Sequence, residues 1–391
     1  MMAAMRARRV VGPLVTVVLA FLLSGVGILA VGKSPWHVYA AIFDGTGLNW
    51  FFHPGSYSIR IPFMTTHVWF PWDTSSGMAQ NLQQTLLTTT PVILTALAVA
   101  VVFRCGMFNI GGQGQYLVGS YAAVVVGSSF AHLASGLHIV FALVAATLAG
   151  AAYAGIAGLC KGLAGAHEVI TTIMLNWIAI WVGSYLFGFG GPLQNSTQPD
   201  LPLSNTVVTG ARLPVFWGPK LLQGLTVGFL IALAMLVVYW VLMNRTTLGF
   251  GIRVVGFNPE AARYGGISVT RNYVVAMAIG GAFAGLAGAC DILGWAFQVD
   301  PTALATDQIA FIGLAAALLG RNTAAGVGAA SLLFGALLTG ASDRHLDPTV
   351  FRPELAADLT TIIQGLVVLF VGLNLTGLTL WWRRRRRRRS A

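Results

Sequence analysis

One segment of the chain has the residue spacing of a phosphate-binding loop. Gly27, Gly32, Lys33 and Ser34 fit the pattern Gly-x-x-x-x-Gly-Lys-Ser, in which loop amides hold phosphates and the lysine neutralises them. That chemistry needs a strand before the loop and a helix after it. Here the intervening residues are Ile-Leu-Ala-Val at the end of a long apolar run. We therefore expect the segment to end a membrane span and not to bind a nucleotide.

The other reactive residue types form no catalytic or metal-binding pattern. Cys105, Cys160 and Cys290 lie in or beside apolar segments and lack metal-ligand spacing, as expected of small buried hydrophobic residues. The sequence contains neither Gly-x-Ser-x-Gly nor His-Glu-x-x-His. It therefore predicts that this chain is not an enzyme and holds no metal or cofactor of its own.

Two apolar segments begin with glycine or polar residues: glycines and amides at 109–115, and Thr306-Asp307-Gln308 at the second. Amides offer hydrogen-bond donors and acceptors without charge, so they suit neutral solutes that are rich in hydroxyls or heterocyclic nitrogens. Glycine-interrupted spans in corresponding halves of a transporter commonly mark a substrate site between repeats. The alternative, that the glycines only allow close helix packing, stays open. The candidate pathway residues in these segments are Asn109, Gln113, Gln115, Tyr116, Asp307 and Gln308.

The composition places the chain in a membrane. Of its 391 residues, 56% are hydrophobic and 9% are charged, whereas about a quarter of a soluble domain is charged. We predict an all-α polytopic protein of about ten transmembrane helices with an internal pseudo-repeat. The predicted spans are 10–32, 82–103, 107–130, 137–160, 170–189, 222–243, 272–293, 306–320, 323–341 and 359–381.

Charge predicts the orientation of these spans. If the amino terminus is inside, the inner loops hold most of the 23 basic residues, and the ten-span count puts both termini in the cytoplasm. The apolar run from Val10 to about Val31 is longer than the core of a signal peptide, so we expect a retained first span. The tail Arg383–Arg389 is expected to lie against anionic lipid and not to bind nucleic acid.

Three regions follow from this pattern. Residues 1–81 form a first span and a long extracytoplasmic segment, residues 82–381 form the transmembrane core, and residues 382–391 form an arginine-rich tail. The outer segments 33–81 and 190–221 are rich in tryptophan and phenylalanine, which favours an interfacial aromatic belt over a ring-stacking site.

The polar loop 244–272 contains a short, well-punctuated helix. Asn258 suits the N-cap, Pro259 the first helical position and Glu260 the positive end of the helix dipole. The Gly265-Gly266 pair ends the helix. A helix this short does not stand alone in water, so it is either a docking element for another protein or an ordinary loop helix.

Intramembrane charge is scarce, which bears on the energy source. Ion-coupled transporters usually need ionisable residues within the membrane, and only Asp291 and Asp307 are near a span, at the predicted outer ends. We therefore expect a partner to supply the energy. A stand-alone secondary transporter or channel is the alternative.

Four ordered motifs resemble those of ABC importer permeases of the ribose, branched-chain amino acid and nucleoside branch. They are the segments 107–115, 168–177, 257–267 and 317–322. The second and fourth are most similar to the nucleoside and simple-sugar subgroup.

The resemblance implies a larger assembly. It comprises a second permease subunit, a cytoplasmic ATPase that carries ATP and magnesium, and an extracytoplasmic solute-binding protein or lipoprotein. In it, the helix from Asn258 through Pro259, Glu260, Ala261, Ala262 and Arg263 to Gly265-Gly266 is expected to couple the permease to the ATPase. The resemblance also points to Lys161, His167 and Glu168 as a second inner contact, and to Asn176 and Trp177 as further pathway residues. The implied function is ATP-driven uptake of nucleosides or related small neutral solutes such as sugars across the cytoplasmic membrane.

Overall fold

The computed structural model describes residues 2–30, 32–60, 67–130, 132–218, 224–342, 361–363, 365–367 and 369–370. In this part of the chain helices predominate, and two short two-stranded sheets accompany them. The described residues contain seven segments long and apolar enough to cross a membrane: Gly12–Ala30, Gly77–Arg104, Ser135–Ala164, Glu168–Phe187, Val227–Arg245, Val269–Ala296 and Pro301–Leu319. The chain is thus a multi-pass membrane protein, as predicted. Most of the predicted span 359–381 and all of the tail 382–391 lie outside the described residues.

The chain forms two compact units. Unit 1 takes the described residues up to Leu82, residues 318–320 and those from Ala336 onward. Unit 2 takes residues 83–317 and 321–335. Helix α3 (Gly77–Arg104) begins in the first unit and continues into the second.

Unit 1 contains more local structure than the predicted aromatic segment 33–81 implied. Its elements are α1 (Met2–Ala30), α2 (Pro35–Gly45), the 3-10 helix η1 (Leu48–Phe52) and an antiparallel hairpin of β1 (Tyr57–Arg60) and β2 (His67–Phe70).

The aromatic residues of unit 1 divide into two sets. Trp50 is buried, packs against Phe70 and Trp72, and donates a hydrogen bond to the carbonyl of Asp73. Trp36 and Trp69 are exposed. Composition could not distinguish the buried set from the exposed set, because burial of Trp50 depends on the folded hairpin, which brings Phe70 and Trp72 against it.

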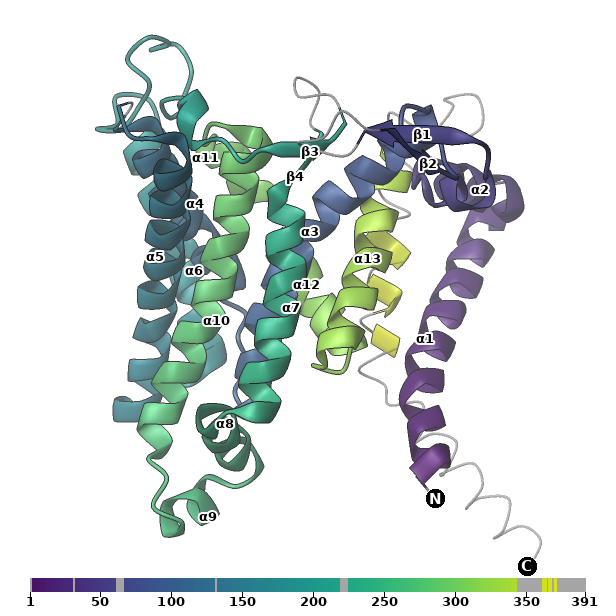
Figure 1. The fold of residues 1–391 in the computed structure, drawn as a ribbon. Helices are drawn as coiled ribbons and strands as arrows, with labels where there is room; N and C mark the ends of the chain where they lie inside the picture. Colours follow the sequence, from purple (N-terminus) through teal and green to yellow (C-terminus); the bar gives the residue numbers. More distant parts are fainter. Residues whose placement is uncertain are drawn as a thin grey trace, which may run out of the picture. The chain divides into compact units, whose positions relative to one another are not determined.

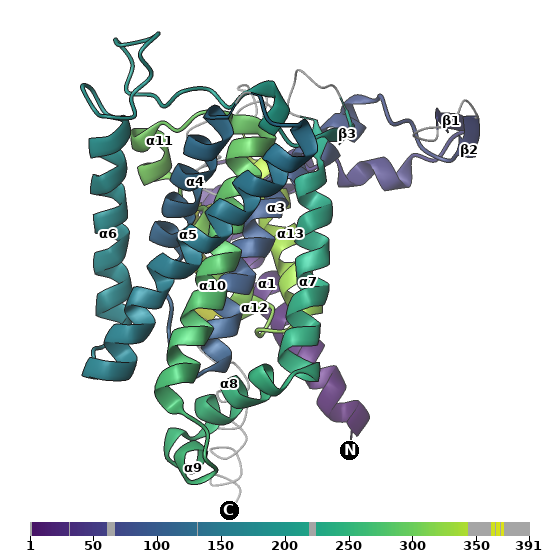
Figure 2. The ribbon, with the colours of Figure 1, turned by 60° about the vertical axis from the view of Figure 1, so that its left-hand side comes forward.

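Unit 2 is a helical bundle with short connecting elements (Figures 1 and 2). Its first helices after α3 are α4 (Gly112–Ser128), α5 (Ser135–Ala164) and α6 (Glu168–Phe187). A loop with the 3-10 turn η2 (Thr209–Ala211) and the strands β3 (Val215–Trp217) and β4 (Leu225–Thr226) leads to α7 (Val227–Arg245). The remaining elements are α8 (Thr247–Phe257), α9 (Pro259–Tyr264), α10 (Val269–Asp291), a π-helical segment η3 (Ile292–Ala296), α11 (Pro301–Thr306), α12 (Ile309–Leu319) and α13 (Ala324–Gly340). The last residues of α12 and of α13 belong to unit 1.

The centre of unit 2 is the packing of α10 against α4 and α5. Close approach of helices in lipid requires small residues at the crossing, and α10 supplies them on two sides. A side chain at Gly285 would collide with the backbone of Ala146 on α5, and one at Gly288 would collide with the backbone of Tyr116 on α4. These glycines of α10 therefore serve helix contacts within this chain.

Two predicted span starts differ from the structure. The predicted span 107–130 is a helix only from Gly112, and residues 107–111 are irregular. Asp307 and Gln308 lie between α11 and α12 and do not open a span. The sequence missed α11 because it is only six residues long; Asp300 caps it by accepting hydrogen bonds from the amides of Thr302 and Ala303.

Candidate functional site

The loop 244–272 folds into two short helices at one end of unit 2. Figures 1 and 2 show α8 and α9 beyond the ends of α7 and α10, at the end of the unit opposite α11. The sequence predicted α9 and missed α8. Helix α8 begins at Thr247 because the Thr246 hydroxyl accepts a hydrogen bond from the Gly249 amide. Its three glycines lower its helix propensity, so the sequence did not indicate this helix.

Helix α9 has the caps that its sequence predicts. The Asn258 side-chain oxygen accepts hydrogen bonds from the amides of Glu260 and Ala261, at 3.0 and 3.1 Å. Pro259 is the first helical residue, and Gly266 has a φ of 75° just beyond the helix. These caps fix the helix ends without help from another protein.

The surface of this end carries large aromatic side chains on either side of the helix. Phe257 is 90% exposed and Tyr264 is 94% exposed, whereas Ala262 is fully buried against the rest of unit 2. Glu260 and Arg263 form an exposed ion pair at 2.7 Å. The helix is thus anchored on one side and presents aromatic and charged groups on the other.

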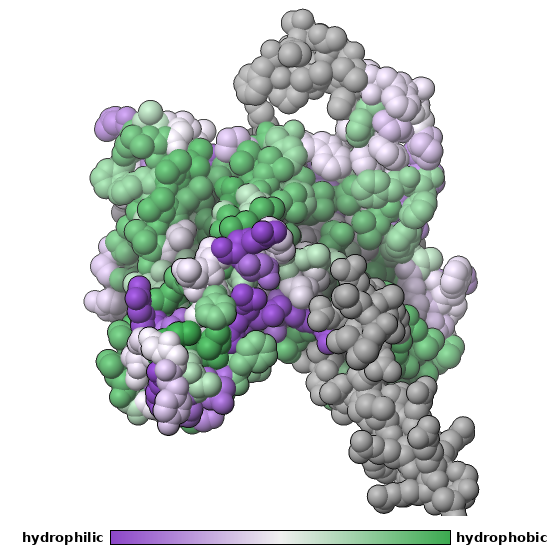
Figure 3. Space-filling model, turned by 60° about the horizontal axis from the view of Figure 1, so that its bottom comes forward, coloured by the Kyte–Doolittle hydropathy of each residue, from purple (hydrophilic) through white to green (hydrophobic). Residues whose placement is uncertain are grey.

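The same end of unit 2 is strongly polar. Figure 3 shows hydrophilic residues gathered around α8 and α9, with apolar residues covering the flank of the bundle. The two acidic residues of this end, Glu168 and Glu260, are each paired with a base. The loops and helix ends here contain the basic residues Arg245, Arg253, Arg263 and Arg271.

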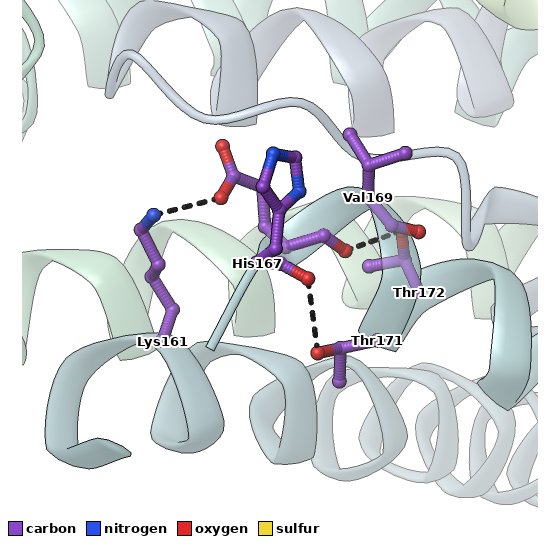
Figure 4. A network of polar contacts seen from close by, with 6 residues as sticks. Lys161, His167, Val169, Thr171 and Thr172 are labelled. Carbon is purple, nitrogen blue, oxygen red and sulfur yellow. Dashed lines mark hydrogen bonds and ion pairs between the residues drawn. The ribbon is translucent and has the colours of Figure 1, made fainter. Parts of the chain in front are cut away.

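The residues expected to form a second inner contact join α5 to α6 (Figure 4). Lys161 of α5 pairs with Glu168 of α6 at 2.8 Å, and both side chains are largely buried. His167 is the N-cap residue of α6, and its carbonyl accepts a hydrogen bond from the Thr171 hydroxyl. Lys161 and Glu168 therefore satisfy each other within this chain.

Three predicted pathway residues hold the start of α4 in place. Asn109 and Gln115 exchange two amide hydrogen bonds, each 3.1 Å long. The Asn176 oxygen accepts from the Gly114 amide at 2.7 Å, and its nitrogen donates to the Ile110 carbonyl. All three side chains are buried, and their bonds tie the irregular segment 107–111 to the first turn of α4.

Gln113 is different, because only half of its amide group is paired. Its nitrogen donates to the Leu304 carbonyl of α11 at 3.1 Å. Its oxygen is buried and has no hydrogen-bond partner among the described residues. An acceptor left in this way is costly unless another group reaches it.

The other predicted pathway residues lie in different surroundings. The Tyr116 hydroxyl donates to the Asp291 carboxylate, 2.6 Å away. Asp307 is partly buried and accepts from the Ile309 amide, while Gln308 is exposed. Trp177 is 55% exposed on an apolar face of α6, and it does not join the cluster around Asn176.

Comparison with known proteins gives a family for this architecture. The family model described as branched-chain amino acid transport system / permease component matches residues 81–372. The chain belongs to this permease family. No solved structure matches it.

Several relatives of the permease have known names. It is 37% identical to the guanosine ABC transporter permease protein NupP of Bacillus subtilis, over 77% of this chain and 83% of that protein. It is 30% identical to the nucleoside ABC transporter permease protein NupB of Lactococcus lactis, over 94% of this chain and 92% of that protein. The glucose ABC transporter permease protein TsgB13 of Haloferax volcanii is 32% identical, over 92% of this chain and 86% of that protein.

The relatives occur as paired permease proteins. Bacillus subtilis has a second one, the guanosine ABC transporter permease protein NupQ, which is 29% identical over 64% of this chain. The permease is therefore a component of an ABC transport system.

Sequence reasoning missed two features of the permease. Asp291, expected near an outer end, is 3% exposed and accepts from Tyr116 and from the Trp295 indole. The sequence shows an aspartate at the end of a glycine-rich apolar span. Whether that aspartate is buried depends on the packing of α4 against α10, which the sequence does not show.

The second missed feature is the turn between α12 and α13. Arg321 and Asn322 both have positive φ values, 53° and 52°. The Arg104 guanidinium and the Tyr239 hydroxyl donate to the Asn322 carbonyl. These bonds tie the turn to α3 and α7, and they give the Arg321-Asn322 motif a structural role.

Proposed function

We propose that the permease translocates nucleosides or related neutral sugars into the cell, as one of two permease subunits of an ATP-driven importer. Three relatives are named for guanosine, nucleosides and glucose, and the paired relatives favour a second, similar permease subunit. The other proposed partners are a cytoplasmic ATPase, an extracytoplasmic solute-binding lipoprotein and membrane lipid. ATP and magnesium belong to the ATPase, and nucleic acid has no part.

The proposed topology has ten spans with an internal repeat and both termini in the cytoplasm. It is supported by the basic residues at the α8–α9 end, since cytoplasmic loops are enriched in arginine and lysine. In this orientation α11 and the 190–218 segment are on the extracytoplasmic side, where a solute-binding protein would deliver the solute.

Helix α9 is the proposed coupling element, and its exposed side is the observation that carries this proposal. Phe257 and Tyr264 expose nearly all of their surface to water, although large aromatic residues are typical anchors of protein interfaces. The buried Ala262 fixes the helix to the bundle, so a push from the ATPase would move α8 and α10 with it. Rigid-body rocking of this kind can exchange outer and inner access. Lys161, His167 and Glu168 are proposed as a smaller contact beside it.

The proposed solute path runs along α4. Gln113 and Tyr116 face it, with Asp307 at its outer end. Asn109, Gln115 and Asn176 shape the start of α4, and the exposed Gln308 and Trp177 contribute at the margins. An inventory of neutral amides in this region suits an uncharged polar solute.

Co-purification and uptake test the proposal together. The tagged permease, expressed with its neighbouring transport genes, is expected to retain an ATPase and a second permease. Membrane vesicles that hold this complex are expected to accumulate labelled guanosine only when ATP is present on the side of the membrane where the ATPase is bound. Uptake by the permease alone, driven by an ion gradient, would instead establish the secondary-transporter alternative.

A further inference from the structure

Asp291 is a buried carboxylate without a basic partner among the described residues. It is 3% exposed at the end of α10. The ion pairs within the described residues are Lys161–Glu168 and Arg263–Glu260, and neither includes it. An ionisable residue inside a membrane protein is costly and is usually kept for function.

The two donors that reach Asp291 leave part of its acceptor capacity free. Tyr116 donates to one carboxylate oxygen at 2.6 Å and Trp295 to the other at 3.1 Å. A carboxylate has about four lone-pair sites, so each oxygen can accept again. The π-helical segment brings Trp295 back to Asp291, and π segments are frequent at functional sites.

A second acceptor without a partner among the described residues lies one helical turn before Tyr116 on α4. Gln113 precedes Tyr116 by three residues on the same helix, so both side chains share one face. The Gln113 oxygen is buried without a partner in the described part of the chain. Asp307 follows Leu304, whose carbonyl holds Gln113, by three residues. No ion pair within the described residues includes Asp291 or Asp307.

An aromatic surface accompanies these acceptors. Trp295 is 37% exposed although its indole nitrogen is bound to Asp291. Its ring can therefore offer an apolar face beside the carboxylate. Acceptors next to an aromatic face match a sugar ring, which has hydroxyl donors at its edge and C–H groups on its face.

We propose that Asp291 and Gln113, with the ring of Trp295, bind the sugar hydroxyls of the transported solute during its passage. This inference rests on the proposed function and names the part of the solute that the site recognises. Asp291 accepts from two hydroxyls, and Gln113 accepts from a third donor. Tyr116, which faces the path, orients the carboxylate through its hydrogen bond.

The site is closed in the structure described here. Gln113 is 2% exposed and its nitrogen is bonded to Leu304 of α11. Helix α11 must therefore move away from α4 before the solute reaches Asp291. Its short length and its position between two irregular segments allow such a movement.

The test compares guanosine with 2′,3′-dideoxyguanosine in vesicles that hold the complete transporter. In the wild type we expect dideoxyguanosine uptake to be less efficient by about tenfold or more, because each hydrogen bond to a charged group is worth about that factor. In Asp291→Asn we expect guanosine efficiency to fall by a similar factor and dideoxyguanosine efficiency to stay unchanged. The discrimination contributed by the binding protein is the same in both permeases and cancels in the comparison.

Two controls separate recognition from folding. Asp300→Asn makes the same chemical change at the cap of α11, where asparagine caps equally well, and is expected to leave both uptakes unchanged. ATPase co-purification reports assembly of each variant. Equal losses of both nucleosides in an assembled Asp291→Asn complex, or no loss of either, would overturn the inference. If the wild type accumulates neither guanosine nor glucose, the proposed solute class itself is wrong.

Discussion

The Tyr116 hydroxyl donates a 2.6 Å hydrogen bond to the Asp291 carboxylate, and this bond joins the beginning of α4 to the end of α10. Both residues are buried. Gly288, one turn before Asp291, makes the bond possible because it lets the two backbones approach each other at Tyr116. The glycine face of α10 and the buried Tyr116–Asp291 hydrogen bond therefore depend on the same close contact between α4 and α10.

Truncating the exposed aromatic residue of α9 tests the coupling role. Tyr264→Ala is expected to weaken ATPase binding by about 2 kcal/mol or more, the loss typical of an interface anchor, and to abolish ATP-driven uptake. Quantitative co-purification measures the binding. Tyr185→Ala on α6, which removes a ring that is 72% exposed on an apolar face, serves as the control. Unchanged ATPase recovery with Tyr264→Ala would remove α9 from the interface.

Replacing the half-paired amide of α4 tests the solute path. Gln113→Leu removes the bond to Leu304 and the unpaired oxygen together, so the bundle is expected to assemble normally. Guanosine uptake is expected to fall by about tenfold or more, since the solute loses a hydrogen-bonding partner in a dry site. The measurement is initial uptake rate against concentration. The control is Gln308→Leu, which makes the same change at an exposed glutamine. It is expected to lower guanosine uptake less than Gln113→Leu does.

Two glycine substitutions test the packing of unit 2. Gly285→Ala places a methyl group against the Ala146 backbone and is expected to destabilise the permease by about 1–3 kcal/mol through overpacking. Gly155→Ala on α5 meets no atom within 4 Å, and alanine favours helix by about 1 kcal/mol. The melting temperature of the detergent-solubilised permease should therefore fall in Gly285→Ala and stay the same or rise in Gly155→Ala. A shared response would show that the α5–α10 contact is looser than described.

A charge exchange tests the bond between α5 and α6. Lys161→Met and Glu168→Gln each leave one partly buried charge unpaired, and each is expected to lower stability by about 1–2 kcal/mol. The double exchange Lys161→Glu with Glu168→Lys should recover part of that loss, limited by unfavourable helix dipoles. If stability recovers while uptake does not, the pair also contacts the ATPase. Single variants with wild-type melting would mean that the pair contributes no stability.

The sequence predicted the features that depend on neighbouring residues. The caps of α9 followed from Asn258, Pro259 and Gly266, because capping depends on neighbouring residues alone. The composition predicted insertion into a membrane. Four short motifs in the sequence predicted the family. The glycine spacing of α10 indicated close packing, although it did not name the helix on the other side.

Tertiary structure decided what the polar residues do. Asn109, Gln115 and Asn176 looked like solute contacts, yet they pair with one another or with the backbone before α4. Asp291 looked peripheral, yet the approach of α4 to α10 buries it. Whether a buried amide or carboxylate is satisfied depends on partners far away in the chain, and the distance between such partners is set by helix packing. That is why sequence determined the elements, their caps and the family, while only the folded bundle separated the residues that hold α4 from the acceptors left free beside it.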